Sequence, residues 1–134
     1  MGKIVAIIEK ASDGGYGVYT KAVDGVCGYG LTEEEAKQDF SDIIEEQADF
    51  YKDKKGVYPD WYSDGIEVEY KYDFSGFFTA FPFFNVSQFA VALGINPSLM
   101  RKYKEGLAFA SEKQKAIIQD KFNEIVSKMT LVQF

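Results

Sequence analysis

Histidine is absent from this 134-residue chain, and cysteine and proline are scarce, at one and three residues. Enzymes that use a Ser-His-Asp triad or a histidine-bound zinc are therefore excluded. Any catalysis would depend on carboxylates, lysine or tyrosine. A single cysteine cannot form an internal disulfide, and we expect Cys27 to be a small buried hydrophobic residue.

Long apolar segments are missing too. No run of residues is long enough to span a bilayer, and the N-terminus shows no signal-peptide pattern. We therefore expect a cytoplasmic protein that does not contact a membrane. Hydrophobic residues nevertheless make up 46% of the chain and aromatic residues 16%, which is enough to build a core in one domain or in two small ones.

The net charge of −6 is divided unevenly along the chain. Residues 1–84 hold 17 acidic and 8 basic residues, a net charge of −9, whereas residues 85–134 hold 4 and 7, a net charge of +3. One explanation is chance clustering of solvated surface charge. The other is that the two parts are modules that face partners of opposite charge. The motifs have to decide between these explanations.

The first module reads as strands, then a helix, then a further strand. Two β-branched and aromatic segments, residues 3–10 and 16–23, flank the turn sequence SDGGY and predict a hairpin. Thr32 and Glu35 have the spacing of a capping box, which predicts a helix that ends near residues 54–56. The apolar stripe of this helix is expected to face inward, and it consists of Ala36, Phe40, Ile43, Ile44 and then Phe50 or Tyr51.

Apolar and charged residues alternate over residues 66–74, which predicts a strand with one buried face. The phenylalanine-rich segment 74–85 is expected to pack in a domain interface or to continue this strand. The fold class is therefore predicted to be α+β. A small antiparallel sheet with one helix occupies residues 1–84, and an all-helical module occupies residues 85–134.

The second module opens with two short helices joined by a tight turn. Ser87 is placed to cap the first helix, and Gly94 supplies the left-handed turn that ends it. Asn96 and Pro97 then cap and open the second helix, which Gly106 closes. The residues expected to face the core are Phe89, Ala90, Leu93, Ile95, Met100 and Tyr103.

The polar residues left outside this core carry donors suited to phosphates and base edges. They are the predicted DNA-binding residues: Gln88, Asn96, Ser98, Arg101, Lys102 and Lys104. The spacing of the two helices resembles the helix-turn-helix of the Cro and XRE-type repressors, although a helical hairpin that does not bind DNA has the same pattern. A later apolar stripe is either core or a dimer seam, and it consists of Ile118, Phe122, Ile125 and Met129.

The first module also resembles a known protein family. The segments GGYGVY and DGVCGYGLTEEEA resemble the signature of HicB antitoxins, in which a hairpin leads to a Gly-Cys, a glycine and then Thr-x-x-Glu-Ala at the start of a helix. Gly30, Thr32, Glu35 and Ala36 match that signature. The order of the modules, this one and then a DNA-binding one, matches the family across nearly the whole chain.

This resemblance implies a partial RNase H-like domain that has no nuclease carboxylate cluster and that covers a HicA-like toxin, a small basic ribonuclease. It implies a non-enzymatic antitoxin without a metal or cofactor, which neutralises the toxin with residues 1–84. Residues 85–134 would repress the antitoxin's own promoter by binding operator DNA. A homodimer or a higher homo-oligomer is expected, because one recognition helix covers too few base pairs.

Two other functions remain open from the sequence. In the first, the front module is a nuclease that gathers Mg²⁺ with carboxylates such as Asp13, Asp24, Asp39 and Asp73. In the second, the chain is a helix-turn-helix regulator without a toxin partner, and its front module is a sensor or a dimerisation unit. Aromatic residues would then line a sensor pocket: Tyr58, Trp61, Tyr62, Phe77, Phe78, Phe81, Phe83 and Phe84.

Overall fold

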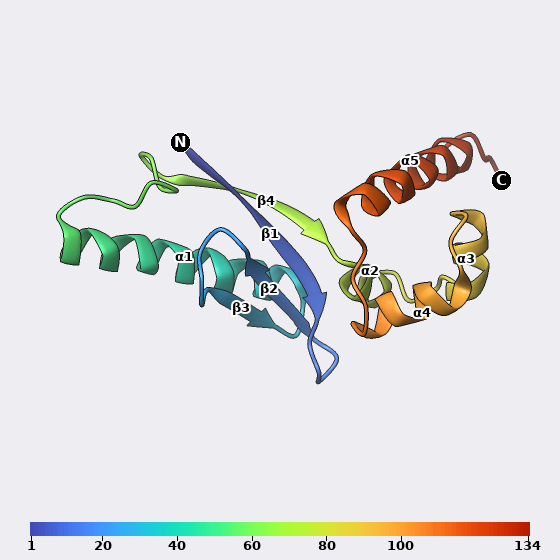
Figure 1. Cartoon of the computed structure of the whole chain (residues 1–134), viewed down its shortest axis with the longest axis horizontal. Coiled ribbons are helices and arrows are strands. Elements are labelled where there is room, and N and C mark those ends of the chain that lie inside the picture. Colours follow the sequence, from blue (N-terminus) through green and yellow to red (C-terminus); the bar gives the residue numbers. More distant parts are fainter. The chain divides into compact units, whose positions relative to one another are not determined.

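The computed structural model describes all 134 residues, which form four strands and five helices. The chain divides into two compact units, residues 1–80 and 81–134 (Figure 1). The sequence analysis places this division after residue 84 instead. No helix combines the length and the apolar character that are needed to cross a bilayer. Each unit is described separately below.

The first unit contains a four-stranded sheet, in the order β3-β2-β1-β4. Its strands are β1 (Gly2–Lys10), β2 (Tyr16–Thr20), β3 (Cys27–Gly30) and β4 (Ile66–Tyr72). The predicted hairpin is present, since β1 and β2 pair antiparallel, as do β2 and β3. β4 pairs parallel to β1, so the sheet is mixed and the prediction of an antiparallel sheet is wrong for this pair. The reason is the long connection through a helix, which returns the chain to the end of the sheet where β1 begins.

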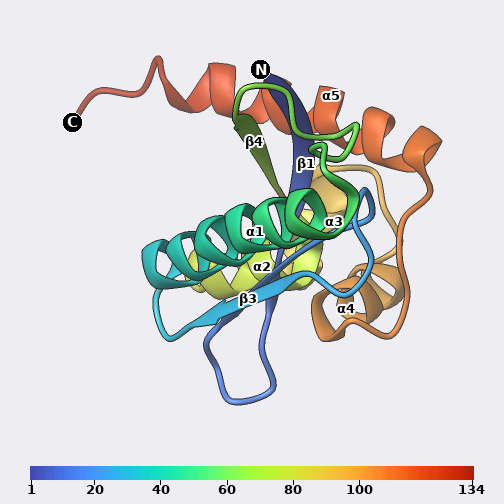
Figure 2. The same cartoon turned by 90° about the vertical axis from the view of Figure 1, so that its left-hand side faces the viewer.

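That helix, α1 (Glu33–Lys55), covers one face of the sheet (Figures 1 and 2). Two glycines of β3 let it come close. A Cβ atom on Gly28 would lie 2.5 Å from the backbone nitrogen of Phe40, and one on Gly30 would lie 2.5 Å from that of Ala36. The core that results contains alternate residues of β1, one stripe of α1, a residue of β2 and the residue before β3. They are Ile4, Ala6, Ile8, Val18, Val26, Ala36, Phe40 and Ile44.

Both ends of α1 are capped as the sequence predicts. The Thr32 hydroxyl accepts a hydrogen bond from the Glu35 N–H at 3.2 Å, and the Glu35 carboxylate accepts one from the N–H of Leu31 at 3.2 Å. At the other end, Gly56 has a φ of 78° and its N–H donates to the Lys52 carbonyl. This left-handed backbone conformation favours glycine, which has no Cβ atom to oppose it.

The apolar stripe of α1 is buried for only part of its length. Ala48 is its last buried residue, whereas Phe50 and Tyr51 are 55% and 40% exposed. The prediction that one of these two residues faces the core is therefore wrong. The helical period continues beyond Ala48, but no core residue packs over this part of the stripe.

The segment after β4 forms a helix, α2 (Phe74–Ala80), and does not continue the strand as one prediction had it. Asp73 ends the strand, because its carboxylate accepts hydrogen bonds from the Ser75 hydroxyl at 2.7 Å and the Gly76 N–H at 2.8 Å. Gly76 then packs against β1, where an added Cβ atom would lie 2.2 Å from the carbonyl oxygen of Ile8. α2 is therefore part of the first unit.

Cys27 is exposed, which corrects the expectation that it is buried. It lies at the start of β3, and its neighbour Val26 enters the core instead, at 4% exposure. Partial burial raises the pKa of the Cys27 thiol, and the nearby carboxylates of Glu9 and Asp39 raise it further. The thiol is therefore protonated and weakly nucleophilic at neutral pH.

The close contact between β3 and α1 predicts that Gly28→Ala lowers the free energy of unfolding of the first unit by about 2 kcal/mol, because backbone atoms of α1 cannot move aside. Gly17→Ala in β2 is the matched control, since its nearest neighbour is the flexible Glu9 side chain at 3.4 Å. Trp61 is the single tryptophan and packs against this core, so its fluorescence in a urea titration reports the unfolding. Equal stability of the two variants would contradict the close contact.

Candidate nucleic-acid interface

The second unit contains two short helices, α3 (Val86–Ala92) and α4 (Pro97–Glu105), near its start. Asn85 is the N-cap of α3, since its side-chain oxygen accepts a hydrogen bond from the Gln88 N–H at 2.9 Å. Ser87 is therefore not the cap, which the sequence analysis had placed two residues too late. Asn85 and Ser87 are both good capping residues, so composition alone does not choose between them.

The turn between the helices has the predicted backbone. Gly94 has a φ of 74°, and a Cβ atom added there would have no neighbour within 4 Å. Glycine is therefore favoured by the left-handed backbone conformation and not by lack of space. The N–H of Ile95 then donates to the Ala90 carbonyl at 2.8 Å, which folds the chain back tightly. Ile95 is 8% exposed and fills the space between the helices, as predicted.

The start and end of α4 also match the sequence. The Asn96 side-chain oxygen accepts hydrogen bonds from the N–H groups of Ser98 at 2.8 Å and Leu99 at 3.4 Å, and Pro97 opens the helix. Gly106, with a φ of 74°, caps the C-terminal end. The core beneath the two helices consists of the predicted residues Phe89, Ala90, Leu93, Ile95, Met100 and Tyr103, together with Ile118 of α5 (Glu112–Met129).

Arg101 joins the first turns of the two helices. One terminal nitrogen of its guanidinium donates to the Ser87 hydroxyl of α3 at 2.9 Å, and the other donates to the Ser98 hydroxyl of α4 at 3.0 Å. The guanidinium carries five N–H donors in a planar fork, so donors remain for a ligand. Because both helices hold it, Arg101 is positioned before any ligand arrives.

The cations of α4 have no acidic partner within the chain. No carboxylate lies within ion-pair distance of Arg101, Lys102 or Lys104. Arg101 and Lys102 are exposed, whereas Lys104 is half-buried, because it lies four residues after the buried Met100. Two positive charges therefore face solvent near the middle of α4, and a third lies at the border of the core.

The other predicted binding residues are also placed at this surface. Gln88, Asn96 and Ser98 are exposed. Ser98 lies beside Arg101, whereas the side-chain oxygen of Asn96 is used in capping and leaves its amide NH₂ group free to donate. The structure thus brings Ser98 and Arg101 together and gives Asn96 a structural role.

Sequence reasoning missed Ser87 as a member of this group. It lies 14 residues before Arg101, on the preceding helix, so no spacing rule for a single helix links the two side chains. The signal that could have found it is the helix-turn-helix itself. Once the first turn of α3 is placed beside that of α4, a hydroxyl in one and a guanidinium in the other come within reach.

This arrangement suits an anionic, repeating ligand. Guanidinium and ammonium groups bind phosphate oxygens, while hydroxyl and amide groups at a helix start can reach base edges. The second unit has 7 basic and 4 acidic residues, a net charge of +3, so its overall field also favours a polyanion. The exposed side of α3 and α4 is therefore a candidate nucleic-acid interface.

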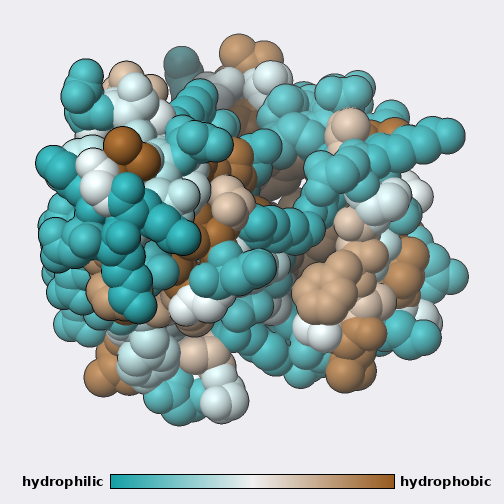
Figure 3. Space-filling view, turned by 60° about the vertical axis from the view of Figure 1, so that its left-hand side comes forward, coloured by the Kyte–Doolittle hydropathy of each residue, from teal (hydrophilic) through white to brown (hydrophobic).

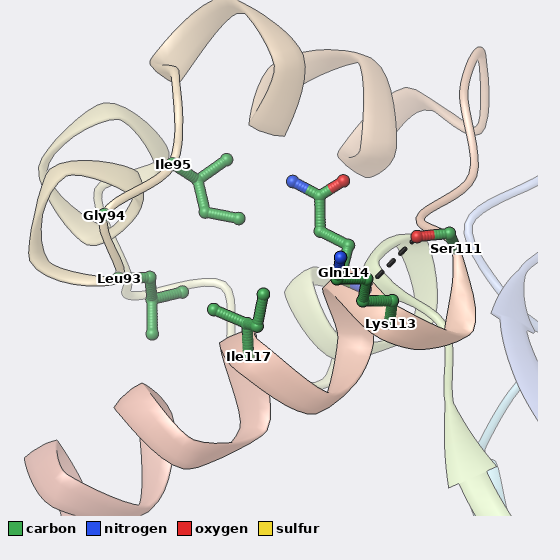
Figure 4. A pocket seen from close by; sticks show the side chains of 7 residues that line it. All are labelled: Leu93, Gly94, Ile95, Ser111, Lys113, Gln114 and Ile117. Carbon is green, nitrogen blue, oxygen red and sulfur yellow. Dashed lines mark hydrogen bonds between the residues drawn. The ribbon is translucent and has the colours of Figure 1, made fainter.

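A shallow hollow of about 370 Å³ lies on another part of this unit, between the turn and the start of α5 (Figure 4). Apolar side chains of Leu93, Ile95 and Ile117 point into it, and Ser111, Lys113 and Gln114 border it. The Ser111 hydroxyl caps α5 by accepting a hydrogen bond from the Gln114 N–H at 3.1 Å. None of the predicted DNA-binding residues lines this hollow.

The stripe of α5 that was expected to be core or a dimer seam is packed in its first part and exposed at its end. Ile118 is 4% exposed, and Phe122 contacts Phe89 of α3 with ring centroids 6.3 Å apart. Met129, near the end of the helix, is 56% exposed. Ile117, near its start, is 53% exposed. On the face of the molecule drawn in Figure 3, hydrophobic side chains are exposed between hydrophilic ones.

The carboxylates that a nuclease would need are not gathered. No group of three or more carboxylate or cysteine side chains lies where it could hold a metal ion. Asp13 accepts hydrogen bonds from the N–H of Gly15 and from the Tyr29 hydroxyl, which lowers the pKa of Asp13. Asp39 accepts from the Tyr29 N–H at 2.8 Å, and Asp73 caps α2. Asp13 and Asp39 thus hold the side chain and the backbone of Tyr29, and Asp73 holds the start of α2, so each carboxylate has a partner in local structure.

The aromatic residues proposed for a sensor pocket are also divided. Tyr58, Trp61, Tyr62, Phe77 and Phe78 belong to the first unit, and Phe81, Phe83 and Phe84 belong to the second. Within the second unit, Phe84 stacks near Phe89 with centroids 4.7 Å apart, which is part of that unit's core. The eight rings do not form one cluster within either unit.

The capping role of Asn96 predicts that Asn96→Ala destabilises the second unit by about 1 kcal/mol, because two N–H groups of α4 lose their acceptor. Asn96→Asp keeps an acceptor oxygen and should be close to wild type. Thermal unfolding followed by circular dichroism measures both variants, and Trp61 fluorescence separates the first unit's transition from the second's. A fully stable alanine variant would contradict the cap.

The chain was compared with protein-family models, with curated proteins and with solved structures, and none of the three comparisons found a match. What the candidate interface binds therefore has to be inferred from its own geometry. The features available for that inference are the two capped helices, the guanidinium that joins them and the cations that have no acidic partner.

Proposed function

We propose that the protein is a HicB-like antitoxin that binds operator DNA through α3 and α4 and neutralises a basic, HicA-like ribonuclease through its first unit. The observation that carries the proposal is the guanidinium of Arg101, held by a hydroxyl from each helix at 2.9 and 3.0 Å and lacking a carboxylate partner. A group fixed in this way loses little freedom when it binds a phosphate, so more of the interaction energy is available for affinity.

The two helices would act as the helix-turn-helix of a Cro or XRE-type repressor, with α4 as the recognition helix. In that arrangement the first turn of α3 lies near the DNA backbone and the N-terminal residues of α4 lie near the bases. Ser98 would be closest to base edges, while Arg101 and Lys102 would bind phosphates. Lys104 is half-buried and would therefore contribute less to phosphate binding than the exposed Arg101 and Lys102.

A homodimer is part of this proposal, because α4 has nine residues and covers only one half-site. The apolar residues that α5 leaves exposed, among them Ile117, Val126 and Met129, are the most suitable surface for a second copy. Charges of both signs accompany them on the same helix, such as Lys121 and Glu124. Two copies of α5 could therefore pair through apolar and complementary charged residues.

The features of the first unit fit the toxin-binding half of the proposal. Its hairpin, third strand, helix and parallel fourth strand follow the order that a partial RNase H-like domain has, and its net charge is −9. An acidic surface favours a basic partner, since opposite potentials speed encounter and disfavour wrong partners. The alternative, a regulator whose first unit is a sensor or dimerisation domain, keeps the DNA-binding half and omits the toxin.

For the DNA-binding half, we expect Arg101→Ala combined with Lys102→Ala to lower affinity for the DNA upstream of the protein's own coding sequence by at least about tenfold. The slope of log K against log salt concentration should become shallower by about 1.8, which corresponds to two lost phosphate contacts. Lys113→Ala, an exposed lysine outside the interface, is the control and should change both quantities less. Unchanged affinity and slope in the double variant would remove the DNA-binding half.

For the toxin-binding half, we expect the full chain to form a complex with a small basic ribonuclease encoded beside it and to stop that enzyme from cleaving mRNA. Gel filtration and a cleavage assay on a defined transcript measure the two effects. Raising the salt concentration should weaken the complex, because the attraction between opposite charges is screened. If no complex forms at low salt, the alternative regulator without a toxin replaces this half of the proposal.

A further inference from the structure

The second half of α1 is an apolar surface that the rest of its unit leaves uncovered. The last buried residue of the helix is Ala48, yet the helix continues to Lys55. Phe50 and Tyr51 are 55% and 40% exposed in this part, and Val57 follows at 62%. Residues 42–57 are called the α1 end below. Large apolar side chains gathered in this way mark interaction surfaces more often than isolated ones do.

The α1 end is held in place by the loop that follows it. The Tyr62 hydroxyl donates to the Glu45 carboxylate at 2.9 Å, and this hydrogen bond raises the pKa of Tyr62 to about 12, so the donor keeps its proton at neutral pH. Tyr58 lies against Tyr62 with ring centroids 4.5 Å apart, and Lys52 lies over the Tyr58 ring at 4.5 Å. The loop therefore supports one side of the helix and leaves Phe50 open.

Carboxylates border this apolar surface. Between Lys37 and Lys52 the helix has no basic residue, and it has five acidic ones: Asp39, Asp42, Glu45, Glu46 and Asp49. Asp42, Glu46, Asp49 and Asp53 are exposed and are spaced three or four residues apart, so they share one side of the helix. None of them forms an ion pair with a lysine or arginine of the chain.

We propose that the α1 end is the surface on which the basic protein partner docks, with Phe50, which lies beside Glu46 and Asp53 on the helix, as its apolar anchor and the carboxylates of Asp42, Glu46, Asp49 and Asp53 facing the partner's lysine and arginine residues. This inference rests on the proposed function and adds to it the place of contact. Exposed aromatic residues within a ring of charge are typical anchors of protein interfaces.

The carboxylate row favours a basic protein as the occupant. The α1 end holds five acidic residues and three lysines, but no lysine lies within the row of Asp42, Glu46, Asp49 and Asp53. Contact with this row would favour a partner's basic residues, whereas the row repels nucleic acid. Lys54 places its ammonium group 4.7 Å from the centroid of the Phe50 ring, so a partner that packs on this face of the ring would displace that ammonium group.

The test uses the full chain and, as the probe, the small basic ribonuclease encoded beside it. Phe50→Ala and Glu46→Lys are made separately, and Glu67→Lys is the matched control, because Glu67 is an exposed acidic residue on β4, outside the α1 end. Surface plasmon resonance gives the dissociation constant and both rate constants at two salt concentrations. Thermal unfolding of each variant checks that it folds, which is expected because all three side chains are exposed.

We expect Phe50→Ala to weaken binding at least about tenfold through faster dissociation, and Glu46→Lys to slow association and reduce its dependence on salt. Glu67→Lys should change the dissociation constant by less than about threefold. If wild type binds and the first two variants bind as well as the control, the α1 end is not the docking surface, while the proposed function stands. If the wild-type chain does not bind the ribonuclease, the toxin-binding half and this inference fail together.

Discussion

One helix has to cover a whole face of a four-stranded sheet, and the first unit is arranged around that requirement. α1 comes close enough to do so because β3 offers Gly28 and Gly30 where side chains would otherwise meet the helix backbone. The same helix carries the chain back to the start of the sheet, which makes β4 parallel to β1. It is also longer than the face it covers, so its last turns have no core to pack on and remain open at the surface.

In the second unit the corresponding constraint is the turn at Gly94. The tight reversal places the starts of α3 and α4 near each other, so that Arg101 reaches Ser87 and Ser98 at once. Hydrogen bonds to hydroxyl groups keep the positive charge intact, whereas an ion pair with a carboxylate would neutralise it. The proposed DNA-binding function rests on this cation, which is both fixed in place and without a carboxylate partner.

Much of the local structure could be predicted from the sequence, because short-range rules decide it. The caps at Thr32, Asn96 and Gly106 and the inward positions of α3 and α4 follow from residue type and spacing. Three predictions that depended on distant contacts were wrong. The pairing direction of β4 depends on the route through α1, the burial of Phe50 or Tyr51 depends on where the sheet ends, and the exposure of Cys27 depends on the register of β3. The contact of Arg101 with Ser87 was missed for the same reason.

The position of β4 at one end of the strand order leaves one of its edges without a neighbouring strand. Such an edge exposes backbone N–H and C=O groups that can pair with another chain and start aggregation. Along β4, Glu67, Glu69 and Lys71 alternate with the residues that face α1, so charged groups line the sheet on its uncovered side. A second sheet that approached this edge would have to desolvate those charges. The chain can therefore keep an open strand at high concentration and still resist edge-to-edge polymerisation.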